Sequence, residues 1–269
     1  MIQHLNNPNP RLRTAAIQFM SREPDVPDLL EALKHPVALV RAGAARVLGL
    51  AKVESAVPAL IGRLNDGDAQ VRMAAIDALG LLRDPQALDP LIACLNDPQA
   101  RVVIRAAHAL AKTANRQAVD PLIVTLQHPN LGVQTMVAFA LGRIGDSRAA
   151  EPLLDAMRCY AMSLEADLHQ WDVENNQRLL LSQNARYGLA HSNVLDQFAA
   201  ALGELGEPAL DLLIVATTDV NRYVRQYGAV ALGAIQDDRS RDILRQLVEH
   251  DSEAEVRRTA AWALSQTML

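Results

Sequence analysis

The sequence predicts an all-α fold, a right-handed superhelix (solenoid) of seven to eight stacked helical hairpins with an enlarged sixth repeat. One pattern, clearest in residues 65–80, recurs along the chain, and the composition is that of closely packed helices. Val71 is followed four, five and eight residues later by apolar side chains, and nine later by Gly80. Because successive helical residues turn by about 100°, this spacing places the apolar side chains on one face, which further copies must cover.

The position of Val71 recurs seven more times, at intervals of 28 to 32 residues apart from one interval of 61. That long interval is one period plus an insertion. A Leu-Gly pair follows most copies, and we expect the glycine to end each helix. Such a fixed period is typical of stacked repeats with one continuous core, so residues 1–269 are predicted to form a single solenoid with an insertion at 158–192. The equivalent positions are Leu12, Val40, Val102, Val133, Val194, Val224 and Val256.

A shorter helix is predicted before each of these helices. It begins at a proline, as at Pro58, Pro90 and Pro121. Proline fits the first helical turn, where its missing N–H would have no partner inside the helix. Each period is therefore read as two helices that form a hairpin.

The composition narrows the class of protein. Half of the residues are apolar but only 3% are aromatic, which favours helices over sheets. The two cysteines, Cys94 and Cys159, have no paired spacing and are interpreted as reduced thiols of a cytoplasmic protein. A net charge of −5 argues against nucleic acid as a partner. No secretion signal and no apolar run of membrane-spanning length is expected.

Several motifs resemble the short HEAT-like repeats of the phycobiliprotein (bilin) lyase family. They are Pro-Leu-Ile-x-x-Leu, an Asn-Asp turn and Val-Arg-x-x-Ala-Ala-x-x-Leu-Gly, and together they cover nearly the whole chain outside the insertion. The resemblance implies a ladder in which the turn aspartate bonds the arginine that follows the core valine of a neighbouring repeat. Val103, Gln134 and Leu195 interrupt this pattern. The ladder residues carried over are Asp66, Asp97, Asp219, Asp251, Arg41, Arg72, Arg225 and Arg257.

The helix face opposite the core is where a binding surface is expected. By the resemblance, this face lines the inner, concave wall of the superhelix. A solvated face should be polar, yet the third to fifth repeats place apolar side chains there, with charged residues beside them. We interpret this face as a docking groove, and leave open the alternative that the same residues are covered as core. The candidate residues are Met73, Arg101, Ile104, Arg105, His108, Met136 and Phe139, with Asp77 at the rim.

The insertion supplies a second group of candidates. Tyr160, Leu164, Leu168 and Trp171 recur at helical spacing, so part of the insertion should extend the first helix of the sixth repeat. Insertions in solenoids tend to lie on one face, often the binding face. A packed helical spur is the open alternative. The binding candidates here are Tyr160, His169, Trp171 and Tyr187.

Catalytic chemistry is not indicated by any motif. Metal-ligand spacings such as Cys-x-x-Cys are absent, as are the His-Glu dipeptides of HEAT-repeat hydroxylases, so neither a catalytic residue nor a metal site is predicted. The favoured function is a non-catalytic scaffold: an assembly factor or chaperone that holds a pigment- or cofactor-carrying protein in its groove. The alternative implied by the resemblance is a bilin lyase, or one chain of a heterodimeric lyase, that attaches or removes a linear tetrapyrrole. Only that alternative requires a bilin.

Overall fold

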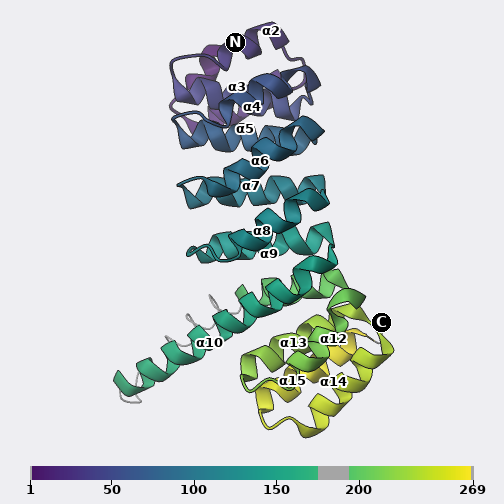
Figure 1. Ribbon diagram of the computed structural model, residues 1–269. Helices are drawn as coiled ribbons and strands as arrows, with labels where there is room; N and C mark the ends of the chain where they lie inside the picture. The colour runs from purple at the N-terminus through teal and green to yellow at the C-terminus, as the bar shows by residue number, and fades with distance from the viewer. Residues whose placement is uncertain (1, 175–193, 268–269) are drawn as a thin grey trace. The chain divides into compact units, whose positions relative to one another are not determined.

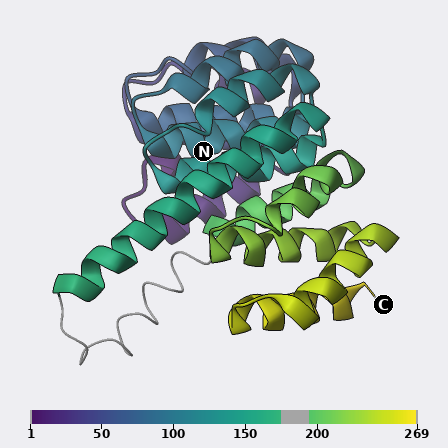
Figure 2. The same cartoon turned by 60° about the horizontal axis from the view of Figure 1, so that its bottom comes forward.

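The structure is a computed structural model that describes residues 2–174 and 194–267, with side chains described at 2–166 and 194–267. This part of the chain contains helices and turns and no strand, which confirms the predicted all-α repeat solenoid. The helices divide into two compact units, Met1–Thr125 and Leu126–Leu269, and each is described by itself (Figures 1 and 2).

Unit one consists of short first helices that alternate with longer second helices (Figure 1). Short 3-10 turns, such as η2 (Glu54–Ala56), lead into several of the first helices. The second helices stack directly: α3 packs on α5, and α5 on α7. The elements are η1 (Ile2–Asn6), α1 (Pro10–Met20), α2 (Val26–Ala32), α3 (Ala38–Leu50), α4 (Val57–Arg63), α5 (Ala69–Leu82), α6 (Leu88–Ala93), α7 (Ala100–Thr113) and α8 (Val119–Thr125).

Unit two repeats this arrangement around one enlarged helix. The first helix of its enlarged repeat, α10, runs for 25 residues, so the predicted helical extension into the insertion is confirmed. A helix over 194–205 follows the segment outside the described residues. The elements are α9 (Leu131–Ile144), α10 (Ala150–Glu174), α12 (Glu207–Ala216), α13 (Arg222–Ile235), α14 (Asp238–His250) and α15 (Ala254–Gln266).

Local chemistry explains where the helices begin. Asp68 caps α5 by accepting a hydrogen bond from the Gln70 amide, and Asn130 caps α9 by accepting one from the Val133 amide. Proline occupies the first turn of α2, α4 and α12. The apolar face of α5 is buried: Val71 and Ala75 are both fully covered.

The glycines of the Leu-Gly pairs do not end the helices, and that expectation was wrong. Helix α5 continues past Gly80 to Leu82, and Arg83 forms its left-handed C-cap. An ideal Cβ built on Gly80 would lie 2.9 Å from the Cβ of Ala109, and one on Gly233 would lie 2.8 Å from the Cβ of Ala263. These glycines therefore stand where the second helices of consecutive repeats touch, because any side chain would hold the helices apart.

Leu12 occupies the position of the core valines, but unlike them it is not buried. Its counterpart Val40 is 2% exposed, whereas Leu12 is 55% exposed. The reason is that Leu12 lies on the face of α1 that, in later repeats, packs against the preceding repeat.

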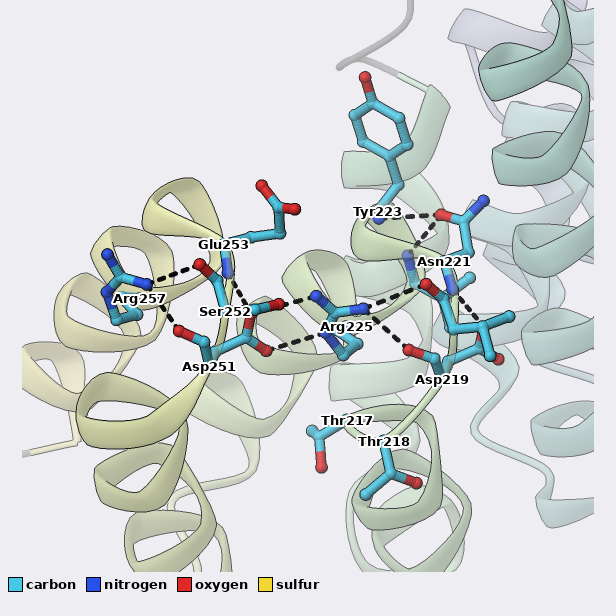
Figure 3. A network of polar contacts seen from close by, with 12 residues as sticks. Thr217, Thr218, Asp219, Asn221, Tyr223, Arg225, Asp251, Ser252, Glu253 and Arg257 are labelled. Carbon is cyan, nitrogen blue, oxygen red and sulfur yellow. Dashed lines mark hydrogen bonds and ion pairs between the residues drawn. The ribbon is translucent and has the colours of Figure 1, made fainter.

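Three of the arginines that follow a core valine, Arg41, Arg72 and Arg225, link their own turn to the next repeat, whereas Arg257 bonds to the carbonyls of its own turn. Arg41 donates from Nε and Nη2 to the Asp66 carboxylate at 2.9 and 2.8 Å. Arg72 binds Asp97 in the same two-pronged way, at 2.7 and 3.0 Å. In unit two Arg225 binds Asp251 at 2.8 and 3.1 Å, and its Nη1 donates to the carbonyl of Asp219 (Figure 3). Each of these three arginines thus fixes one turn and one neighbouring repeat.

Candidate functional site

The second-helix wall of unit one carries the first group of candidate residues. Helix α5 presents Met73 and Asp77, and α7 presents Ile104, Arg105 and His108. Met73 and Ile104 are half-buried, so part of each apolar side chain stays in contact with solvent. Arg101 also lies on α7 and is exposed. We call these six residues the α5–α7 wall.

Charge on the α5–α7 wall is mainly positive. The one carboxylate, Asp77, pairs with Arg105 Nη1 at 3.4 Å, while both side chains remain partly exposed. Burial lowers the pKa of His108, and the nearby Lys112 and Arg105 lower it further against the opposing effect of Asp77. His108 is therefore a neutral imidazole near pH 7. The wall offers apolar contact surface beside guanidinium groups that suit carboxylates or phosphates.

Unit two contributes the remaining candidates whose side chains are described. Met136 and Phe139 lie half-buried on α9, and Tyr160 lies buried on α10. Helix α10 also includes His169 and Trp171, whose side chains fall outside the described part. Tyr187 lies outside the described residues altogether.

Around Tyr227 the binding candidate Tyr160 comes together with Asp196 and Tyr223, a grouping that the sequence did not predict. Burial raises the pKa of Tyr227 to about 12, and the neighbouring groups Asp196, Tyr223 and Tyr160 add to this effect. Partial burial also raises the pKa of the Asp196 carboxyl. Groups with shifted pKa values that gather from three helices mark a candidate site. The separation of Tyr160 from Tyr223 and Tyr227 in sequence hid this cluster, because helical spacing relates only nearby residues.

The enlarged helix α10 is anchored to the turn before α13. Arg158 Nε donates to the Asp219 carboxylate at 3.2 Å, and Asn221 Nδ2 donates to Glu165 at 2.8 Å. Asp219 therefore receives its guanidinium from α10, since the usual ladder position holds Leu195, which is buried. These bonds fix α10 to the body of unit two at Arg158 and at Glu165.

Two observations bear on metal and thiol chemistry in the part of the chain that the structure describes. No group of three His, Cys, Asp or Glu side chains there could hold a metal ion. Burial raises the pKa of the Cys94 thiol to about 11, so Cys94 is a poor nucleophile near neutral pH. Among the described helices, none is long and apolar enough to cross a membrane.

A family model for HEAT repeats matches residues 26–111, 90–159 and 186–265. The chain belongs to the HEAT-repeat family. The ladder arginines, the turn aspartates and the interlocking glycines are thus packing features of HEAT repeats, whereas the exposed face of each second helix is free to differ. None of the curated proteins compared with this chain matches it.

Solved structures with the same HEAT-repeat architecture have different functions. The complex of CpcE and CpcF of phycocyanin lyase from Nostoc sp. PCC7120 matches at 22% identity with a TM-score of 0.50, covering 91% of this chain and 95% of that one. Kap121p matches at 13% identity with a TM-score of 0.61, covering 98% of this chain but 32% of that one. Importin beta matches at 14% identity with a TM-score of 0.60, covering 98% and 39%. At these identities the similarity concerns the fold.

Proposed function

We propose that this HEAT-repeat protein is a non-catalytic binding scaffold, an assembly factor or chaperone that holds a pigment- or cofactor-carrying protein against its second helices. The observation that carries the proposal is the α5–α7 wall, where half-buried Met73 and Ile104 lie among exposed arginines. Apolar surface that stays in contact with solvent and is rimmed by charged groups is typical of binding surfaces. In unit two, considered by itself, Met136 and Phe139 are half-buried apolar side chains on α9 and are candidates for a separate contact with the partner.

Arginine gives this surface its selectivity. Arg101 is exposed on α7, and Arg105 is held by Asp77 only through a long, solvent-accessible ion pair. An exposed pair of this kind contributes little to stability, roughly 0–1 kcal/mol, so a carboxylate of a partner can replace Asp77 at small cost. The partner is therefore expected to present acidic groups beside an apolar patch.

A bilin lyase, or one chain of a two-chain lyase, is the second candidate. It is favoured by the resemblance of the repeats and by the fold shared with the CpcE and CpcF complex. A linear tetrapyrrole combines a long apolar body with two propionates, which matches the composition of the α5–α7 wall. In that case Arg101 and Arg105 would bind the propionates, and a second protein chain would complete the enzyme.

Phycocyanin apoprotein and a free linear tetrapyrrole are the two probes that separate these candidates. The scaffold proposal predicts co-elution with the apoprotein in size-exclusion chromatography and an unchanged tetrapyrrole absorbance spectrum. A shifted spectrum, or transfer of the pigment to the apoprotein, supports the lyase instead. Failure to bind either probe refutes both candidates for this class of partner.

Charge reversal locates the binding surface. The double variant Arg101→Glu, Arg105→Glu should bind at least about tenfold more weakly and melt within a few degrees of wild type. The matched control is Lys52→Glu, Arg83→Glu, because both residues are exposed in inter-repeat loops and the net charge changes equally. Equal losses in both double variants would show that net charge, and not the α5–α7 wall, governs binding.

A further inference from the structure

Helix α7 carries a row of basic side chains along the face that belongs to the α5–α7 wall. The row begins at Arg101 and continues four, seven and eleven residues later. Because successive helical residues turn by about 100°, these four positions lie within a sector of roughly 60°. Arg101 and Arg105 are exposed, and His108 and Lys112 are half-buried. We call these four residues the α7 row.

The charged members of the α7 row act on one another and on one carboxylate. Burial lowers the pKa of His108, and the positive charges of Lys112 and Arg105 lower it further, so the three groups lie close together. Arg105 Nη1 lies 3.4 Å from the Asp77 carboxylate, and both of these side chains remain partly exposed. Three permanent cations therefore project from one side of α7 with a single anion beside them.

The neighbouring second helices do not repeat this row. At the four equivalent positions α3 has one basic residue, Arg46, which is exposed, and α5 has none. Asp77 is the one acidic residue at these positions in α3, α5 and α7. The aspartates of the adjoining turns, Asp66 and Asp97, are held by ladder arginines. This face is therefore positive in a chain whose net charge is −5. The positions compared are Leu39, Gly43, Arg46 and Leu50 in α3, and Gln70, Ala74, Asp77 and Leu81 in α5.

The spacing of the α7 row favours a helix as its partner. Along the axis of α7 the four side chains are separated by about 6.0, 4.5 and 6.0 Å, or about 16.5 Å in all. A second helix with carboxylates at i, i+4, i+7 and i+11 has the same intervals, and this order reads the same in either chain direction. Side chains on one side of an extended strand are about 6.8 Å apart, so the fourth would lie about 20 Å from the first, beyond Lys112.

We infer that the α7 row binds an acidic helix of the partner protein, with aspartate or glutamate at i, i+4, i+7 and i+11 and an apolar side chain beside that row. Carboxylates of this helix pair with Arg101, Arg105 and Lys112. Its apolar side chain contacts Met73 and Ile104, which are half-buried beside the row. The inference rests on the function proposed for the α5–α7 wall and specifies the part of the partner that this wall recognises.

A second copy of this chain is a poorer match to the α7 row. Helix α14 has acidic residues at three positions of such a row, but Arg245 occupies the remaining position. Two of those acidic residues, Asp238 and Asp242, already pair with Arg241 and Arg245 of the same helix. Docking α14 on α7 would place Arg245 among the cations of the row, which is unfavourable.

Two synthetic helices of identical composition test the spacing. The first is an alanine-rich helix of about 20 residues with four glutamates at i, i+4, i+7 and i+11 and two leucines beside them. Fluorescence anisotropy should show that it binds the full-length protein and that added salt weakens the binding. The second helix has the four glutamates on different faces and should bind at least about tenfold more weakly. Circular dichroism verifies that the two peptides are equally helical.

A single charge reversal tests the far end of the row. Lys112→Glu should weaken binding of the first helix by roughly threefold or more, because an exposed ion pair is replaced by a repulsion. The matched control is Lys52→Glu, which changes the net charge equally at an exposed residue outside the row and should bind as wild type does. Circular dichroism verifies that both variants are folded.

Several results would overturn the inference. They are no binding of the first helix, equal binding of the two helices, or equal losses in Lys112→Glu and Lys52→Glu. Self-association in analytical ultracentrifugation that Lys112→Glu abolishes, or binding to heparin that exceeds binding to the helix, would do the same by naming another occupant.

Competition with phycocyanin apoprotein separates this inference from the proposed function. If the apoprotein binds and the first helix does not displace it, the scaffold proposal stands and the acidic helix is wrong. If the first helix binds with the expected spacing and the apoprotein does not bind, the acidic helix stands and the proposed class of partner is wrong.

Discussion

Adding one methyl group at Gly49 tests how closely consecutive repeats pack. Gly49 lies inside α3, and an ideal Cβ there would stand 2.6 Å from both Cα and Cβ of Ala78 in α5. Ordinary contacts of this kind are 3.4–4 Å long. Because the obstacle includes backbone, a side-chain rotation cannot relieve the clash, and α3 and α5 must separate.

The expected magnitude follows from two opposing effects. Overpacking a closed interface costs about 1–3 kcal/mol, and a contact with backbone falls near the upper end, about 3 kcal/mol. Alanine is favoured over glycine inside a helix by about 1 kcal/mol. Gly49→Ala should therefore lower the free energy of unfolding by about 2 kcal/mol, which corresponds to a Tm lower by roughly 4–8 °C.

Gly62 provides the matched control for this experiment. It lies in helix α4, and a Cβ there would meet nothing within 4 Å. Gly62→Ala should then show only the helix-propensity gain, about 0.5–1 kcal/mol of added stability. Thermal and urea unfolding followed by circular dichroism measure both variants. If Gly49→Ala is as stable as Gly62→Ala, the close helix approach does not exist in solution.

Three further predictions concern acid stability, a buried hydroxyl and thiol reactivity. Burial opposes ionisation of Asp66 and Asp251, but hydrogen bonds from Arg41 and Arg225 hold both pKa values below the usual range. The two ionised carboxylates contribute fully to the free energy of unfolding above about pH 5, and this contribution is lost as the pH falls through about 4 and lower. Replacing both aspartates with asparagine should make the free energy of unfolding, measured in urea, depend less on pH in this range. The Ser240 hydroxyl is buried and has no hydrogen-bond partner among the described residues, so Ser240→Ala should raise the free energy of unfolding by about 1 kcal/mol. A loss of stability would show that the hydroxyl has a partner. Cys159 is exposed, whereas burial raises the pKa of Cys94 to about 11, so a thiol reagent at about pH 8 should modify only Cys159 until the protein is unfolded.

The repeat pattern predicted the architecture well because each helix carries its own local signals. Core valines, first-turn prolines and capping aspartates act within a few residues, so they can be read from one repeat and transferred to the next. The role of Gly80 could not be read in this way. A glycine that ends a helix and one that admits a neighbouring helix look alike in sequence, and only the approach of Ala109 separates them.

Contacts between residues far apart in the chain also could not be predicted from the sequence. Leu195 appeared as a gap in the ladder, yet Asp219 still binds a guanidinium because Arg158 reaches it from α10, 61 residues earlier. The cluster of Tyr227 with Asp196 escaped for the same reason. The binding residues on the α5–α7 wall remain predictions, since an exposed face shows where a partner has access but not which partner it is.

Hydrogen–deuterium exchange tests the central claim, binding at the exposed face of the second helices, most directly. The measurement compares the full-length protein alone and with phycocyanin apoprotein. Peptides from α5 and α7 should exchange more slowly in the complex, and the Arg101→Glu, Arg105→Glu variant should lose that protection. Protection confined to the first helices α4 and α6, with α5 and α7 unchanged, would contradict the account.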